Sequence, residues 1–141
     1  MYRIRRRERD SGVSSMEWAM LTPLLLGLIF LVVQFALVYY AREVALGAAQ
    51  SGARVARTDL SGRWQQDAQD QARLTADQLG GGLVSGLTPV AGGDMANNNR
   101  WVDVTGTAVM LIPFVKISVH ERAGGPIECF RPDLNGGINC K

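Results

Sequence analysis

An apolar run from Trp18 to Ala41 contains no charged side chain, and only Thr22 and Gln34 are plainly polar within it. As a helix with a rise of about 1.5 Å per residue, the run would be roughly 36 Å long, more than the thickness of a hydrocarbon core of about 30 Å. It therefore predicts a single membrane-spanning helix, which we expect over residues 13–41.

Charge is distributed unequally around this run. Residues 1–12 hold five arginines and two acidic residues, whereas one basic and one acidic residue balance each other just beyond the run. The positive-inside bias predicts residues 1–12 as a cytoplasmic basic leader and residues 42–141 outside, in a single-pass protein of the cytoplasmic (plasma) membrane. Trp18 and the pair Tyr39 and Tyr40 lie where interfacial aromatics would anchor the two ends of the span.

The basic excess of the chain belongs to the leader. The 15 basic and 13 acidic residues become 10 and 11 once residues 1–12 are set aside. Nucleic-acid binding needs a basic face on a folded domain, and no basic cluster with interleaved aromatics follows the leader. We therefore expect no nucleic-acid partner.

Two general interpretations of the N-terminus stay open. A cleavable secretory signal would fit the basic start and a small-x-small site at residues 45–47, although the apolar core of such signals usually spans about 7 to 15 residues. Arg42 and Glu43, just before such a cut, also count against it. An uncleaved signal anchor would explain the helix and its orientation, with Glu17 snorkelling to the headgroups. The chain would then be an extracytoplasmic binding protein with no pilus role.

A more specific interpretation comes from the entrance of the apolar run. Residues 12–17, Gly-Val-Ser-Ser-Met-Glu, are preceded by the basic leader and followed by a Leu-rich helix. This arrangement resembles the N-terminus of TadE-like proteins, the pseudopilin-type components of tight-adherence (Flp) pilus systems. The likeness runs from Ser11 to Arg57, because residues 52–57, Gly-Ala-Arg-Val-Ala-Arg, are similar to the continuation that follows the TadE membrane helix.

The resemblance implies that a prepilin peptidase cuts on the cytoplasmic side, between Gly12 and Val13. Glu17 would become the fifth residue of the mature chain and an assembly carboxylate, which pairs with the terminal amine of a neighbouring subunit. The implied role is structural, in a pilus or a related secretion apparatus. Besides membrane lipid, the implied partners are the prepilin peptidase, other pilins or pseudopilins and the inner-membrane assembly platform.

Charge pairing gives the spacing between cut and carboxylate a physical reason. Cleavage would free an α-amine whose ordinary pKa is about 7.7 to 8.0, and a carboxylate four residues along a helix attracts such a cation. Partial neutralisation lowers the cost of holding either charge near apolar surroundings, although desolvation offsets much of the gain. Glycine before the cut leaves the backbone accessible to a protease.

Pro23 lies inside the apolar run and removes one backbone donor. It predicts a helix kink or a local loosening, which is tolerable if neighbours or Thr22 satisfy the freed carbonyl. Both a simple bend near the entry point and a role in assembly remain open.

We expect a helical stalk at residues 42–79, with a break at 58–62. Small residues recur before the break, which either permits close helix packing or reflects the helix propensity of alanine. These residues are Ala45, Ala48, Ala49, Gly52, Ala53 and Ala56. After the break, a second set recurs near the helical period and predicts an amphipathic helix that packs on the domain's own sheet. This set is Trp64, Ala68, Ala72, Ala76 and Leu79.

Residues 80–141 predict a loop-rich β head. The stretch 80–99 is rich in Gly, Pro and Asn and predicts a loop. Apolar and polar residues alternate from Trp101, which predicts a half-buried strand, with further strands at residues 116–122 and 127–131. The expected fold class is therefore α+β: a long transmembrane helix that continues into an extracytoplasmic helix, followed by a small antiparallel sheet.

Cys129 and Cys140 are the two cysteines of the chain, and turn-forming residues separate them. In an extracytoplasmic domain, we expect a disulfide between them that contributes on the order of 2 to 3 kcal/mol. Free thiols are the alternative. A zinc site would need more ligands than His120 adds.

The sequence offers no catalytic motif. His120 is expected on an exposed or edge strand face beside Glu121, and no Ser or Cys lies in a nucleophile motif. Asp67 and Asp70 are typical of a solvated helix face. The three glycines at 80–82 are not followed by the Gly-Lys-Ser/Thr of a phosphate-binding loop. We expect no enzyme activity, no metal, no cofactor and no small-molecule substrate.

Overall fold

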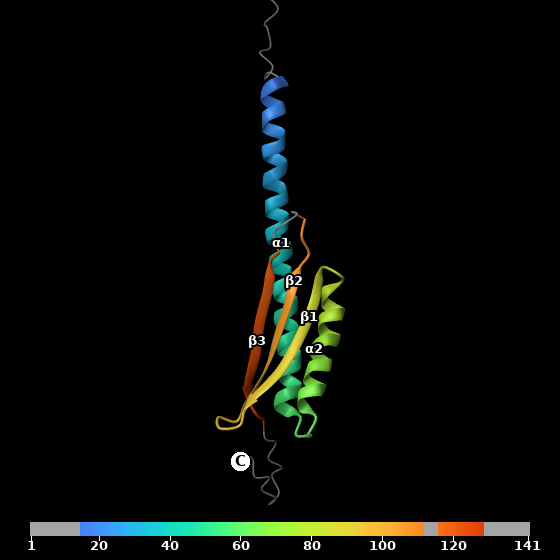
Figure 1. The fold of residues 1–141 in the computed structure, drawn as a ribbon, viewed down its shortest axis with the longest axis vertical. Helices are drawn as coiled ribbons and strands as arrows, with labels where there is room; N and C mark the ends of the chain where they lie inside the picture. Colours follow the sequence, from blue (N-terminus) through green and yellow to red (C-terminus); the bar gives the residue numbers. More distant parts are fainter. Residues whose placement is uncertain (1–14, 112–115, 129–141) are drawn as a thin grey trace, which may run out of the picture.

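The computed structural model describes residues 15–111 and 116–128, which form two helices followed by three strands. The helices are α1 (Ser15–Thr58) and α2 (Trp64–Gly80), and the strands are β1 (Val84–Asp94), β2 (Asn99–Ala108) and β3 (Ser118–Pro126). The strands form one antiparallel sheet in the order β1-β2-β3, so that β2 is central (Figure 1). The expected α+β architecture is confirmed.

α1 is one helix in two different surroundings. Its N-terminal part projects beyond the rest of the molecule, and its C-terminal part packs against α2 and the sheet (Figure 1). The helix is long and apolar enough to cross a membrane, and only 6% of its most apolar 18-residue window is buried. It continues without a break past residue 41, where the predicted span ends.

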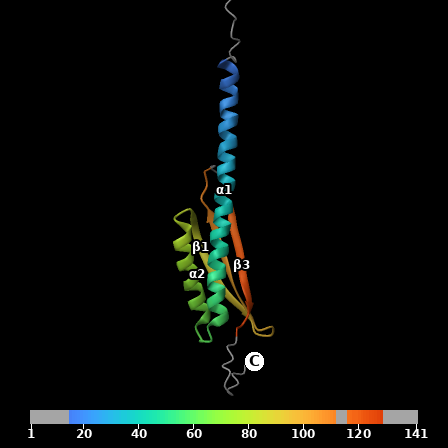
Figure 2. The same ribbon diagram turned by 180° about the vertical axis from the view of Figure 1, so that it is seen from behind.

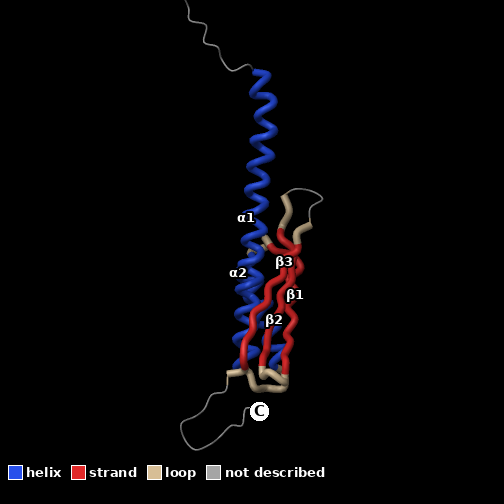
Figure 3. The backbone as a smooth tube through the Cα atoms, turned by 90° about the vertical axis from the view of Figure 1, so that its left-hand side faces the viewer, coloured by secondary structure: helices blue, strands red, loops and turns tan. Residues whose placement is uncertain are grey.

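Both helices lie on the same side of the sheet. The strands stand in front of α1 in Figure 1 and behind the helices in Figure 2, and Figure 3 shows helices and strands as two layers. α1 packs against β2 and β3, whereas α2 packs beside α1 and against β1. The two helices run antiparallel, because Gly47 faces Leu79 while Gly52 faces Ala68 and Ala72.

Alanine side chains fill the space between these elements. The buried alanines are Ala41, Ala45, Ala48, Ala49, Ala53 and Ala56 of α1, Ala68, Ala72 and Ala76 of α2, and Ala108 of β2. Val102 and Val104, which project from β2 into the same cluster, are the largest fully buried side chains among the described residues. The small-residue rows of α1 therefore permit close packing, and their partners are α2 and the sheet of the same chain.

The break between the helices covers residues 59–63, one residue later than the predicted 58–62. α1 ends at Thr58 and α2 begins at Trp64. Between them, the carboxylate of Asp59 accepts hydrogen bonds from the amide of Ser61 at 2.7 Å and from its hydroxyl at 2.9 Å, which forms an Asx turn. These bonds from Ser61 lower the pKa of Asp59.

The predicted amphipathic helix is confirmed as α2, with one correction. Its buried residues follow a four-residue step and end in Gly80, whereas Leu79 is 48% exposed. As predicted, the helix packs on the sheet of the domain, mainly against β1, and it also packs extensively against α1. The short connection at 59–63 turns α2 back directly alongside α1.

The loop predicted over residues 80–99 is wrong, because residues 84–94 form β1. Three loop-favouring residues are accommodated within this strand, which lies at the edge of the sheet. Pro89 cannot donate a hydrogen bond, which an edge strand tolerates. Gly86 has a φ of 64° within the irregularity between Ser85 and Thr88, as β-bulges often require. Gly92 leaves room for the indole of Trp101, to which a Cβ would come within 2.8 Å.

The other two strands are partly as predicted. β2 alternates as expected and begins at Asn99. β3 covers Ser118–Pro126 in place of the predicted 116–122. We predicted a further strand at 127–131, but residues 127 and 128 are outside any strand. The third strand of the sheet is β1. Residues 129–131 of that prediction lie outside the described residues.

Gly52→Ala should destabilise the head. A Cβ at this position would lie 2.7 Å from the carbonyl oxygen of Ala68 and 3.0 Å from the Cβ of Ala72. Because the first of these atoms belongs to the backbone of α2, the two helices must separate. We expect a loss of about 1 to 3 kcal/mol, as in other overpacked cores, measured by thermal unfolding of the full-length protein in detergent.

Gly47→Ala is the matched control, since it makes the same change on the same helix. Its Cβ would meet the terminal Cδ1 of Leu79 at 3.1 Å, and that exposed side chain can rotate away. A loss at Gly47 equal to that at Gly52 would contradict the close helix contact as the cause.

Candidate functional site

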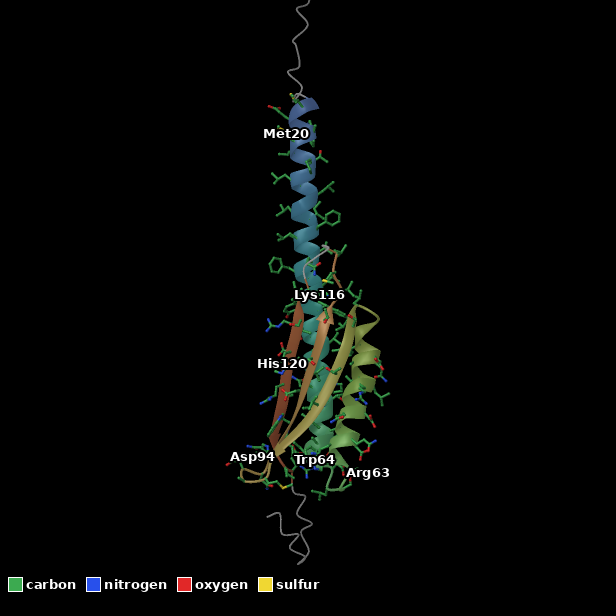
Figure 4. The ribbon with its side chains drawn as sticks, in the orientation of Figure 1. Met20, Arg63, Trp64, Asp94, Lys116 and His120 are labelled. Atoms are coloured by element: carbon green, nitrogen blue, oxygen red, sulfur yellow. The ribbon has the colours of Figure 1, made fainter. Side chains whose placement is uncertain are left out.

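A continuous apolar surface covers the projecting part of α1. Every side chain from Met16 to Val33 is exposed, and no charged residue occurs between Glu17 and Arg42. Side chains extend from all sides of the helix around Met20 (Figure 4). A helix that is apolar all round is suited to lipid or to other apolar helices, and not to water.

Glu17 lies in the first turn of α1, and its side chain is exposed. A carboxylate there is favourably placed against the partial positive charge of a helix N-terminus. Within residues 15–111 and 116–128, it forms no ion pair. Gly12 and Val13, the expected cleavage site, lie outside the described residues.

α1 continues through Pro23. The hydroxyl of Thr22 donates to the carbonyl of Trp18 at 2.7 Å, whereas the carbonyl that Pro23 leaves without its helical donor is that of Ala19. The suggestion that Thr22 satisfies the freed carbonyl is therefore wrong, because a helical threonine bonds back to the carbonyl four residues before itself. A kink at Pro23 stays a prediction.

Gln34 is a buried polar residue at the level where the projecting part of α1 meets the head, with 6% of its surface exposed. Its Nε2 donates to the carbonyl of Val109 at 3.4 Å, and its Oε1 accepts from the amide of Leu111 at 2.8 Å. The sequence marks Gln34 only as a polar member of the apolar run. A further signal was its helical spacing to Ala41 and Ala45, which places it on the face that the head covers.

Two arginines of α1 hold β3 against the helix. Arg42 pairs through Nε with Oε1 of Glu121 at 3.1 Å. Arg57, part of the stretch that carries the family resemblance, donates from Nε to the carbonyl of Pro126 at 3.1 Å and pairs with Glu128. Both pairs are partly exposed, so that each contributes at most about 1 kcal/mol. Their main effect is to fix the position of β3 along α1.

The sheet face opposite the helices carries a charged cluster. Asp103 accepts two hydrogen bonds from Arg122, at 2.6 and 2.8 Å, and lies 3.3 Å from Nε2 of His120. The hydrogen bonds from Arg122 lower the pKa of Asp103 and raise the pKa of Arg122. Arg122 also lies over the ring of Trp101, 5.4 Å from its centroid. His120 is exposed on the edge strand β3, as expected (Figure 4).

This cluster matches the strand pairing and shows no catalytic arrangement. Asp103 and Arg122 are direct neighbours across β2 and β3, and opposite charges at such positions stabilise a sheet. In residues 15–111 and 116–128, no group of three His, Cys, Asp or Glu side chains could hold a metal. The expected disulfide between Cys129 and Cys140 lies outside the described residues and stays a prediction.

A cleft of about 430 Å³ opens at the far end of the head, beside Trp64 and Asp94 (Figure 4). Arg100 lies against it, stacked on Trp64 at 4.2 Å. Its guanidinium donates to the carbonyls of Ala56 at 2.7 Å and Asp59 at 2.6 Å. Arg100 therefore satisfies carbonyls at the C-terminus of α1, and these contacts indicate a structural role.

Comparison with known proteins assigns a family to α1. Residues 12–54 match the family described as TadE-like protein. The chain carries a TadE-like domain at these residues. The expected extent, from Ser11 to Arg57, agrees closely with the match. No curated protein and no solved structure gave a significant match.

The TadE-like domain includes Glu17, the exposed apolar part of α1 and most of the small-residue rows. TadE-like proteins are a pilin-like structural family, so that the match implies pilus-system partners in general terms. α2 and the sheet lie outside the match. The match therefore assigns no role to the head.

Acid should weaken the head partly through Asp103. Because hydrogen bonds from Arg122 lower its pKa in the folded state, the carboxylate stabilises the fold above its unfolded pKa of about 3.9, and this stabilisation is lost as the pH falls through the lower folded pKa. Asp103→Asn should lose up to about 1 kcal/mol at neutral pH, and the difference from the parent should shrink in acid. Thermal unfolding against pH measures this.

Asp70→Asn serves as the control, because Asp70 has an exposed partner, Arg73, one turn away on α2 at 3.4 Å. We expect it to change stability less than Asp103→Asn at neutral pH. If both variants differ from the parent by the same amount at every pH, the contact between β2 and β3 does not carry the acid sensitivity.

Proposed function

We propose that the protein is a TadE-like pseudopilin or minor pilin, with a structural role in assembling a tight-adherence (Flp) type pilus or a related secretion apparatus. The observation that carries this proposal is where the TadE-like match falls. Residues 12–54 include a projecting helix whose side chains are all exposed from Met16 to Val33, with Glu17 in its first turn. A pilin-like subunit needs an apolar helix of this kind, which lipid covers first and neighbouring helices cover later.

The proposed topology places residues 1–12 in the cytoplasm, the span at 13–41 in the cytoplasmic membrane and the head outside. The five arginines of residues 1–12 support this orientation. A prepilin peptidase then cuts between Gly12 and Val13 on the cytoplasmic side. The proposed partners are this peptidase, membrane lipid, other pilins or pseudopilins and the inner-membrane assembly platform.

Cleavage gives Glu17 its proposed task. A carboxylate near the hydrocarbon region is costly unless it is paired. The new amine of Val13 on a neighbouring subunit is a cation that can pair with it and bring the two helices into register. The Ala and Gly rows farther along α1 are already covered by α2 and the sheet, so that contacts between spanning helices fall to the exposed residues 16–33.

Processing can be tested on protein extracted from the membranes of its host. N-terminal sequencing and intact mass should find a chain that begins at Val13, and Gly12→Leu should leave the leader attached because a bulky side chain obstructs the peptidase. A parent chain that keeps Met1 would favour the signal-anchored binding protein. A start near Ala48 would favour a secreted domain.

Glu17→Ala should abolish pilus assembly while leaving cleavage and the head intact. Removing one partner of a buried charge pair costs about 3 to 5 kcal/mol, because the other charge is left uncompensated. The measurement is the yield of surface pili in the host, at equal membrane levels of the subunit. Glu17→Gln keeps the size but not the charge and should behave like alanine. Glu43→Gln, at the other end of the span, should assemble normally.

Assembly at the parental level by Glu17→Gln would refute charge pairing as the task of this carboxylate. Loss of assembly by Glu43→Gln to the same degree would show that any charge change near the span is disruptive.

A further inference from the structure

Two short arms, residues 109–111 after β2 and residues 116–117 before β3, continue beyond the ends of these strands (Figure 3). The amide of Ala108 donates to the carbonyl of Ile117 at 3.2 Å. Beyond this pair, the carbonyl of Val109 and the amide of Leu111 bond to the side chain of Gln34 at 3.4 and 2.8 Å. These bonds fix the arm after β2 at the level of Gln34.

Gln34 lies within the expected membrane span. Tyr39, which is 67% exposed, is the interfacial aromatic on the head side, and Gln34 precedes it by five residues, roughly 8 Å of helix rise. Measured from the other end, a span of about 30 Å that begins at Trp18 ends near Val38. Both estimates place Gln34, and the arm bonded to it, inside the hydrocarbon region of the head-side leaflet.

Backbone groups at this depth need partners within the protein. The amide of Val109 donates to the carbonyl of Leu83 at 3.2 Å, and its carbonyl accepts from Gln34. The amide of Leu111 donates to the same side chain. Both polar ends of the glutamine amide are therefore bonded. These three backbone groups thereby meet the condition under which non-helical backbone is tolerated in a bilayer.

The side chains of the arm are apolar and uncovered. Met110 is 38% exposed and Leu111 is 47% exposed. Lys116, on the returning arm, is exposed and lies where the head meets the projecting helix (Figure 4). Apolar side chains with a lysine at their edge match a leaflet, in which acyl chains contact the former and headgroup phosphates attract the latter.

We propose that residues 109–111, with Lys116 at the rim, form a second membrane contact that dips into the head-side leaflet. Acyl chains of lipid are the partner, because the exposed side chains of Met110 and Leu111 lie at the level of Gln34, next to the exposed apolar part of α1. This contact holds the head against the bilayer. This inference depends on α1 spanning the membrane but not on a pilus role. The lipid contact can therefore fail while the pilus role holds, and the pilus role can fail while the lipid contact holds.

Photo-crosslinking tests the contact directly. The full-length protein carries p-benzoylphenylalanine in place of Leu111 and is reconstituted at one copy per lipid nanodisc. Mass spectrometry should find lipid adducts at this position, as for the same probe in place of Phe35, which is 69% exposed on α1. The probe in place of Met95, which is 93% exposed between β1 and β2, should give none.

Two results would overturn the proposal. One is a probe at Leu111 that, like the probe at Met95, forms no lipid adduct. The other is a probe at Leu111 that, in membranes of the host, is captured by protein in place of lipid, which would assign the surface to a neighbouring subunit.

Gln34→Leu tests the anchor. Without the glutamine amide, the carbonyl of Val109 and the amide of Leu111 lose their partners, and the arm should leave the hydrocarbon region. We expect the lipid-adduct yield at Leu111 to fall about fivefold, the factor that corresponds to about 1 kcal/mol for a hydrogen bond. The yield at Phe35 should not change, which controls for insertion and folding. An unchanged yield at Leu111 would reject Gln34 as the anchor.

Discussion

The close approach of α1 to α2 and the sheet is the constraint on which the rest of the structure depends. Polarity alone does not determine which part of an apolar helix contacts lipid and which part contacts protein. In α1 the two parts differ in side-chain size. Large side chains are exposed in the first half, and alanines are buried in the second. At Gly52 even a Cβ would meet the backbone of α2. The dispersion energy of such an interface comes from many short contacts, which a larger side chain would remove by separating the helices.

Helical periodicity made much of this fold predictable from the sequence. The long apolar helix follows from a run without charge, the break after Thr58 from residues that favour turns, and the buried face of α2 from helical spacing. β1 did not follow, because Gly86 and Pro89 signal a loop and only the edge position of the strand removes that conflict. The pairing of Asp103 with Arg122 was also out of reach, since it depends on the register of two strands.

The candidate site was also only partly predictable from the sequence. The position of Glu17 at the entrance of the apolar run could be predicted, because it is a property of the sequence alone. The surroundings of Gln34 could not, since its partners Val109 and Leu111 lie more than seventy residues away along the chain. Gln34 is thus satisfied within the molecule, whereas the partner of Glu17 in our proposal belongs to another subunit. The two polar groups of one span therefore have different consequences when they are lost, a local opening for the first and a failure of association for the second.

Because α1 continues without a break from its projecting part into the head, a tilt of the helix also moves the head. About 27 Å of helix separates Tyr40 from Thr58, and spanning helices tilt by about 20° on average. Because α1 continues as one helix from Tyr40 to Thr58, such a tilt carries the far end of the head sideways by roughly 9 Å. In the proposed topology, small rotations of α1 inside the bilayer are thereby amplified into displacements at the cleft beside Trp64.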